Sequence, residues 1–244
     1  MSCTTWTPPA VASESAGWRE WAWRVVEAQH VASTMKLVDG LAEQGILEEL
    51  VEASKPEVPV AAAVLHYLVQ APFRYPPPRH GSRFRGPDDP GVFYGAETPR
   101  TACAELGYWR WRFVADAKDL RELPPVPHTL FRVEVGGRAI DLRKRPFAEE
   151  ETVWRDRFDY ARTQGFAAVA REAGIEAIVY ASVRDPDQGW CVAVLTPKAL
   201  TLPPKETGGQ TWWLTVHPAG VVWYRQGGEC HSFAAEGWVG GCEP

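Results

Sequence analysis

The sequence predicts an α+β fold, in which helices accompany a mixed or antiparallel sheet. Three observations predict it. Apolar residues recur at helix-type spacing early in the chain, strand-like apolar runs then alternate with two helical segments, and the connections are too irregular for a doubly wound parallel sheet. We expect one domain over residues 1–244, with an N-terminal helical segment (1–70), a core (71–200) and a C-terminal hairpin tail (201–244).

Two helices are predicted before the core. Residues 31–53 carry apolar side chains at spacings of three and four, which marks an amphipathic helix strained at Gly40 and Gly45. Prolines end this helix, and residues 61–69 predict a second, short and buried one. The proline run at 76–78 then imposes an irregular loop.

A strand, a turn and a helix are predicted next. Residues 91–96 form a short β-rich run, and Thr98-Pro99 places a capping hydroxyl and a proline at the start of a helix that reaches about Arg112. The remaining elements are a hairpin of residues 129–135 and 138–142 around Gly136-Gly137, a helix over 152–173 ended by Gly174, strands over 175–181 and 191–196, and a closing hairpin of 214–216 with 221–224.

The charges of the chain are distributed unevenly. The 244 residues have a formal net charge of -5, and the first 70 residues, with nine acids against four bases, account for all of it. Such a balance gives no general attraction for nucleic acid. Seven arginines crowd residues 74–112 against four acids. This local positive excess predicts a small anionic ligand rather than a polymer.

Several classes of protein are excluded by composition. No run of about 18 apolar residues indicates a membrane span, and residues 1–10 lack the basic start and apolar core of a secretory signal. Five cysteines, odd in number and scattered, indicate neither a disulfide framework nor a zinc knuckle. No two histidines or cysteines lie at ligand spacing, so no metal is expected. We expect a cytoplasmic protein.

Three short segments place unusual polar residues at the ends of predicted elements. They are Gly81-Ser82-Arg83-Phe84-Arg85, then Val92-Phe93-Tyr94-Gly95-Ala96-Glu97-Thr98 with Ala102-Cys103-Ala104-Glu105, and Ile178 to Pro186. Together, and in this order, they resemble the RES domain, which is named for its arginine, glutamate and serine and is the toxin half of bacterial toxin–antitoxin pairs. The similarity spans about 83–195, and residues 23–30 and 38–50 resemble the N-terminal part of longer members.

The resemblance assigns roles to particular residues. The family's arginine falls on Arg83, its tyrosine on Tyr94, its glutamate on Glu105 and its serine on Ser182, with Arg85 as a competing choice for the arginine. The loop after the arginine departs from the tryptophan, asparagine and proline of shorter members, so its contacts are left open.

The resemblance also implies a fold and an activity. The implied fold is that of diphtheria-toxin-type ADP-ribosyltransferases. The implied activity is breakdown of NAD, by phosphorolysis in some members and by transfer of ADP-ribose to a protein in others. It further implies an Xre-like helix-turn-helix antitoxin over the site, and a toxin dimer.

The residue types suit this chemistry. The nicotinamide of NAD is a cationic leaving group, so cleaving its N-ribosyl bond requires a nucleophile and a carboxylate that stabilises an oxocarbenium-like transition state. Glu105 would be that carboxylate. Arg83 would clamp an anion, and Tyr94 would stack on nicotinamide with its hydroxyl free. Ser182 and Arg184, and Arg85 as a further candidate, would bind phosphate or ribose oxygens.

Other interpretations stay open at this point. The four side chains have structural alternatives: an exposed helix glutamate, a loop salt bridge, a core tyrosine and a loop-capping serine. A non-catalytic nucleotide-binding module and a glycosidase that pairs Glu105 with Asp185 at about 5 to 9 Å are further possibilities. An acyl-transfer role for Ser182 is disfavoured because no Gly-x-Ser-x-Gly motif is present. Water, phosphate or a protein side chain could accept the ADP-ribosyl group.

Overall fold

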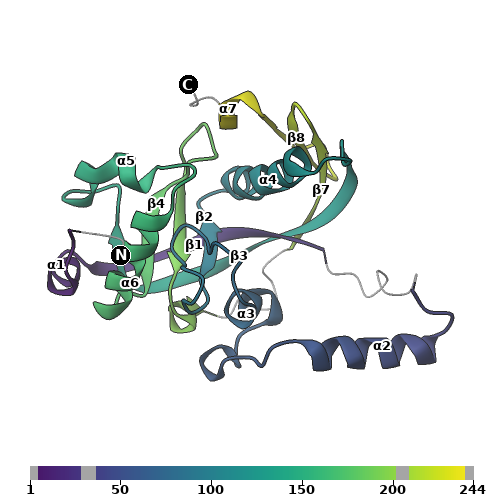
Figure 1. Ribbon diagram of the computed structural model, residues 1–244, viewed down its shortest axis with the longest axis horizontal. Helices are drawn as coiled ribbons and strands as arrows, with labels where there is room; N and C mark the ends of the chain where they lie inside the picture. Colours follow the sequence, from purple (N-terminus) through teal and green to yellow (C-terminus); the bar gives the residue numbers. More distant parts are fainter. Residues whose placement is uncertain (1–4, 29–36, 202–208, 240–244) are drawn as a thin grey trace.

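One mixed sheet organises the protein (Figure 1). The computed structural model describes residues 5–28, 37–201 and 209–239, and within these nine strands join one sheet. They are β1 (Ala16–Glu27), β2 (Phe93–Ala96), β3 (Leu123–Asp141), β4 (Ala177–Ala181), β5 (Trp190–Val194), β6 (Leu200–Thr201), β7 (Gln210–His217), β8 (Gly220–Arg225) and β9 (Cys230–Ala234). The order is β1-β2-β5-β4-β3-β7-β8-β9, and β6 pairs with β3. Since only β3 and β4 pair in parallel, the predicted α+β class with a mixed sheet is confirmed.

Helices flank this sheet on both sides. They are α1 (Pro8–Ser13), α2 (Leu41–Ser54), η3 (Val60–Ala62), α3 (Tyr67–Arg74), α4 (Pro99–Asp116), η4 (Phe147–Glu150), α5 (Glu151–Trp154), α6 (Ala161–Glu172), η5 (Pro197–Ala199) and α7 (Glu236–Val239). In Figure 1, α4 lies beside β7 and β8, α5 and α6 lie near β4, and α2 projects away from the sheet. Among the described residues, no helix combines the length and the apolar character that crossing a bilayer requires.

The five strands that carry the site, β1 to β5, pair with one another in a closed ring. β1 pairs with β3 along its whole length, from Ala16 opposite Ala139 to Glu27 opposite His128. On its other edge β1 meets β2, where Trp23 lies opposite Ala96. The path from β1 through β2, β5, β4 and β3 therefore returns to β1.

Two hydrophobic cores lie on opposite faces of the sheet. Successive side chains of a strand point to opposite faces, so Ile178 and Tyr180 of β4 pack into the core beneath α4 and α6. Ala177 and Val179 pack into the other core, with α3. This alternation places Tyr180 on the α4 side of the sheet, which is the side of the site described below.

The local signals around α4 and α6 are confirmed. The Thr98 hydroxyl accepts a hydrogen bond from the Thr101 amide at 3.1 Å, and Pro99 occupies the first turn. The predicted strand before this helix is β2. After α6, Gly174 adopts φ +70, the left-handed backbone that glycine tolerates at the end of a helix. The predicted closing hairpin is β7 with β8, and β9 extends it.

The expected N-terminal helical segment contains a long strand, which corrects the expectation for residues 1–70. In β1 the apolar residues alternate: Trp18, Ala22 and Val26 pack into one core, whereas Trp23 and Val25 pack into the other. That period of two is the period of a strand buried on both faces.

The two expected helices of this segment also differ from the structure. Of the helix expected over 31–53, residues 31–36 lie outside the described part, and α2 begins at Leu41, directly after Gly40. The helix expected over 61–69 is instead the short η3 followed by α3.

The predicted hairpin around Gly136-Gly137 is wrong, because β3 runs through both glycines as one strand. A Cβ on Gly137 would lie 2.5 Å from Glu176 Oε2, and one on Gly136 would lie 3.3 Å from the Arg19 guanidinium carbon. The glycines therefore make room for neighbouring side chains and do not form a turn.

The helix predicted over 152–173 is interrupted. The Asp156 carboxylate accepts hydrogen bonds from the amides of Phe158 and Asp159, both at 2.8 Å. Such local bonds compete with helical ones, and they leave the loop 155–160 between α5 and α6.

Candidate functional site

A cavity of about 840 Å³ opens on the α4 side of the sheet. Arg83, Tyr94, Glu105 and Arg184, which the sequence singled out, all line it. The other lining residues are Trp23, Arg24, Val25, Pro78, His80, Gly81, Ser82, Gly95, Ala96, Ala102, Leu106, Tyr108, Trp109, Arg112, Asp116, Arg157, Phe158, Tyr160, Tyr180 and Cys191. Segments far apart in the sequence therefore converge on one site.

Glu105 lies in the second turn of α4, with one carboxylate oxygen held. Its Oε1 accepts a hydrogen bond from the Ser182 hydroxyl at 2.6 Å, and the Cys191 thiol lies 3.7 Å from the same oxygen. Its Oε2 has no hydrogen-bond partner in the described part of the chain. The half-buried carboxylate thus has one anchored and one available oxygen.

Ser182 is fully buried at the end of β4. Its Oγ accepts hydrogen bonds from the amides of Arg184 at 3.2 Å and Asp185 at 3.0 Å, and donates to Glu105. Because a hydroxyl has a single hydrogen, the Ser182 hydrogen points to the carboxylate. Ser182 therefore caps a turn and orients Glu105, and its expected contact with phosphate or ribose stays a prediction.

Arg83 and Arg85 separate clearly in space. Arg83 lines the cavity, donates Nη1 to the Trp154 carbonyl at 2.8 Å, and places its guanidinium 4.7 Å from the Tyr160 ring centre. Arg85 is not among the lining residues, and its guanidinium donates to the carbonyls of Asp89 and Tyr75. Burial lowers the pKa of Arg85. Of the two candidates, Arg83 faces the cavity.

Arg184 provides an unused donor. Its side chain is buried, with Nη2 bonded to the Arg157 carbonyl at 2.5 Å and the guanidinium 3.5 Å from the Tyr108 ring centre. Its Nη1 is buried and has no hydrogen-bond partner among the described residues. A buried donor without a partner is costly, so this atom is suited to an oxygen of a bound anion.

The hydroxyl of Tyr94 is engaged, in contrast to the free hydroxyl expected. It lies 2.8 Å from the Ser82 hydroxyl and accepts a hydrogen bond from the Phe84 amide at 3.0 Å. Burial raises the pKa of this phenol. Tyr94 therefore ties β2 to the turn that carries Arg83, and only its ring is left for the cavity.

Arg24 is a cavity residue that the reasoning from sequence missed as a site residue. It donates Nη1 to the Tyr94 carbonyl at 2.8 Å and lies 4.7 Å above the Phe93 ring. Burial lowers the pKa of its guanidinium to about 10. The available signal was its place in the segment 23–30 that resembles longer RES members. With it, five arginines and two acids line the cavity, which is therefore positively charged.

Two buried groups beside Glu105 were also missed. Burial raises the pKa of the Tyr180 phenol and of the Cys191 thiol well above their ordinary values, and the Glu105 carboxylate acts in the same direction on both. Both groups are therefore neutral at physiological pH. They form an uncharged wall behind the carboxylate. Tyr180 lies within the segment 178–186 that the sequence singled out, although no role was assigned to it, and no motif marks Cys191.

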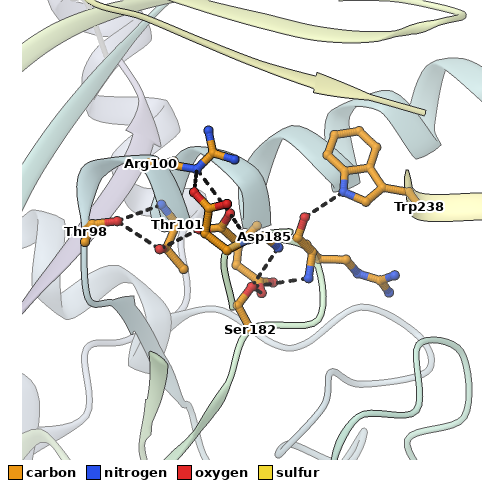
Figure 2. A network of polar contacts seen from close by, with 9 residues as sticks. Thr98, Arg100, Thr101, Ser182, Asp185 and Trp238 are labelled. Atoms are coloured by element: carbon orange, nitrogen blue, oxygen red, sulfur yellow. Dashed lines mark hydrogen bonds and ion pairs between the residues drawn. The ribbon is translucent and has the colours of Figure 1, made fainter. Parts of the chain in front are cut away.

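The arrangement does not provide the two facing carboxylates of a glycosidase. Asp185 does not line the cavity; it accepts a hydrogen bond from the Thr101 hydroxyl at 2.8 Å and lies 3.3 Å from Arg100 Nε (Figure 2). Asp116, the other acid of the cavity, lies three helical turns from Glu105 on α4, or about 16 Å along the axis. The glycosidase interpretation needs a separation of about 5 to 9.5 Å. The described residues contain no cluster of three or more His, Cys, Asp and Glu side chains suited to a metal ion.

The cavity therefore combines a cationic wall, one half-free carboxylate and several aromatic rings, which are groups suited to an anionic, aromatic ligand. The family described as the RES domain matches residues 58–217, and the chain belongs to this family, which confirms the resemblance. A chain in the crystal structure of the MbcT–MbcA toxin–antitoxin complex of M. tuberculosis is similar to this one. The TM-score is 0.47 and the sequence identity 12%, over 87% of this chain and 92% of that chain. No curated protein sequence gives a significant match.

Proposed function

We propose that the protein is an NAD-consuming toxin of the RES type, which cleaves the N-ribosyl bond of nicotinamide. One observation carries the proposal. Glu105, with Oε1 held 2.6 Å from Ser182 and Oε2 available, lies on the wall of an arginine-rich cavity. Guanidinium groups suit the pyrophosphate of a dinucleotide, and the carboxylate suits a positive charge that develops on ribose.

The proposed reaction uses these groups separately. The Arg83 guanidinium and Nη1 of Arg184 bind anionic oxygens of NAD. The C1′–N bond breaks and its electron pair stays on the nicotinamide nitrogen, so that neutral nicotinamide leaves without an acid. Glu105 Oε2 stabilises the positive charge at C1′, and an oxygen of water or phosphate forms the new bond; attack by water releases a proton. A contribution of about 3 kcal/mol from the carboxylate corresponds to a rate factor of about 100.

Regulation and location form part of the same proposal. The toxins of this family act in pairs with antitoxins, and a cognate Xre-like helix-turn-helix antitoxin would cover the cavity and block NAD. A cytoplasmic location fits both partner and substrate, and a homodimer is part of the expected assembly. Transfer of ADP-ribose to a protein, and binding without catalysis, are the alternatives, and the following experiment separates the second of them from NAD cleavage.

The test is release of nicotinamide by purified protein incubated with NAD, with and without phosphate. We expect release in at least one condition, and a loss of about 100-fold in Glu105→Gln. A folded wild-type protein that releases none in either condition would overturn the proposal. Growth arrest by expressed protein should vanish in Glu105→Ala; arrest that persists would indicate a binding module.

A further inference from the structure

The loop between β4 and β5 is fastened to the first turn of α4 by one buried carboxylate (Figure 2). Asp185 Oδ2 accepts a hydrogen bond from the Thr101 hydroxyl at 2.8 Å, and Oδ1 lies 3.3 Å from Arg100 Nε. Thr101 in turn lies 2.9 Å, hydroxyl to hydroxyl, from the capping Thr98. The negative charge of Asp185 thus meets the positive end of an 18-residue helix.

The neighbouring acid differs in burial. Asp187 Oδ2 lies 2.7 Å from the same Arg100 Nε, but its side chain is 70% exposed, whereas that of Asp185 is 1% exposed. Exposed ion pairs contribute little, whereas breaking a buried one is costly. Asp187 is therefore a matched control for Asp185.

The contacts of Asp185 with Thr101 and Arg100, called the clamp below, hold the loop in which the Ser182 hydroxyl receives its hydrogen bonds. The Asp185 amide donates to Ser182 Oγ at 3.0 Å and the Arg184 amide donates at 3.2 Å. A hydroxyl has two lone pairs and one hydrogen, so these two amides leave the hydrogen for Glu105 Oε1. The chain of contacts begins on the first turn of α4 and returns to its second turn.

We propose that Asp185 is a positioning residue, which locks the loop against α4 so that Ser182 holds Glu105 with Oε2 toward the cavity. The inference rests on the proposed function for its kinetic consequence. Asp185 is not among the residues that line the cavity, so we expect it to act on the rate of the chemical step through Ser182 and Glu105, and not through substrate binding.

The kinetic test compares Asp185→Asn with Asp187→Asn in nicotinamide release from NAD. We expect kcat of Asp185→Asn to fall about 10- to 100-fold with KM changed less than about threefold, and Asp187→Asn to stay within about twofold of wild type. Thr101→Val should reproduce the fall from the other end of the clamp, and Thr101→Ser should restore activity. Equal effects of the two Asp variants, or a fall confined to KM, would overturn the inference.

A double-mutant cycle separates positioning from general loss of structure. If Asp185 acts through Ser182, Asp185→Asn lowers kcat less than about threefold in a Ser182→Ala background. A full, multiplicative loss there would contradict the inference. Each variant is used only after thermal unfolding shows it to be folded.

A readout without turnover keeps this inference distinct from the proposed function. The carboxyl ¹³C resonance of Glu105, assigned by its loss in Glu105→Gln, reports the Ser182 hydrogen bond directly. It should shift in Asp185→Asn as it does in Ser182→Ala, and stay in place in Asp187→Asn. If the wild type cleaves no NAD, the proposed function fails, but this measurement still decides the role of Asp185. A Glu105 resonance that does not move in Asp185→Asn would overturn the positioning role.

Discussion

Arg83 and Arg85 are two residues apart and have different surroundings. The Arg83 side chain is buried at the cavity, between the Trp154 carbonyl and the Tyr160 ring. The Arg85 guanidinium binds the carbonyls of Asp89 and Tyr75, away from the cavity. Their chemistry is the same, so a comparison of matched substitutions isolates the effect of place.

Arg83→Lys should lower kcat/KM for NAD cleavage about 10- to 100-fold, because an ammonium cannot reproduce the forked donor geometry. Arg85→Lys should change it less than about threefold. Steady-state nicotinamide release measures both. A larger loss in Arg85→Lys would mean that the wrong arginine has been placed in the site.

Tyr94→Phe should destabilise the fold by about 1–3 kcal/mol, because the Phe84 amide loses its acceptor inside the protein. Urea unfolding measures the change. Tyr75→Phe is the control, because Tyr75 is 40% exposed and loss of its hydroxyl should matter little.

Tyr94 also predicts a pH dependence of the free energy of unfolding. Burial raises the pKa of Tyr94 above its ordinary 10.0, so the folded phenol keeps its proton where the unfolded one ionises. That contribution to stability is intact below about pH 10 and is lost as pH rises toward the folded pKa. Wild type should therefore lose stability above pH 10 more steeply than Tyr94→Phe. Parallel curves would contradict the assignment.

Strand β2 passes very close to β1 where the closed path of strands is completed. A Cβ on Gly95 would lie 2.7 Å from the Ala22 Cβ and 3.5 Å from Val192 Cγ1. Gly17 of β1 has no atom within 4 Å of its added Cβ. The two glycines therefore differ in the space around them.

Gly95→Ala should cost about 1–3 kcal/mol of unfolding free energy, since extra volume must be forced between two strands. Gly17→Ala should be neutral or slightly stabilising, because it reduces the freedom of the unfolded chain. Denaturant unfolding of both variants decides. Comparable losses in the two variants would mean that crowding at Gly95 does not set the cost.

At this scale, the sequence predicted elements whose signals are local. Thr98 and Pro99 specify the start of α4 by themselves, so strand, turn and helix were predicted correctly. Gly136-Gly137 is compatible with a turn or with crowding, and only the distant Glu176 and Arg19 decide between them. Likewise, the sequence identified the motif residues. The direction of the Ser182 hydrogen could not be predicted, because it depends on the positions of the Arg184 and Asp185 amides.

For the molecule as a whole, β1 is the strand that closes the site from outside the family match. It precedes the matched residues 58–217, yet Trp23, Arg24 and Val25 line the cavity. Ala22, fully buried in β1, packs into the core that contains α3. A charged side chain at this position should therefore destabilise the whole fold.

Ala22→Asp should destabilise the protein by about 4 kcal/mol or more, because an unpaired carboxylate would be buried between strands. The exposed Glu20→Gln in the same strand is the control and should stay within about 0.5 kcal/mol of wild type. Circular dichroism and thermal unfolding measure both. A stable Ala22→Asp protein with intact NAD cleavage would show that β1 is dispensable for the core.

The C-terminal end of the described chain reaches back to the pocket. Trp238 donates its indole N–H to the Arg184 carbonyl at 2.8 Å, and the Gly237 carbonyl accepts a hydrogen bond from Arg157 at 3.1 Å. Domains acquire their structure as units while synthesis proceeds from the N-terminus. The cationic wall therefore receives these two supports only after residue 238 has left the ribosome, so a nascent chain that stops short of it cannot carry a finished pocket.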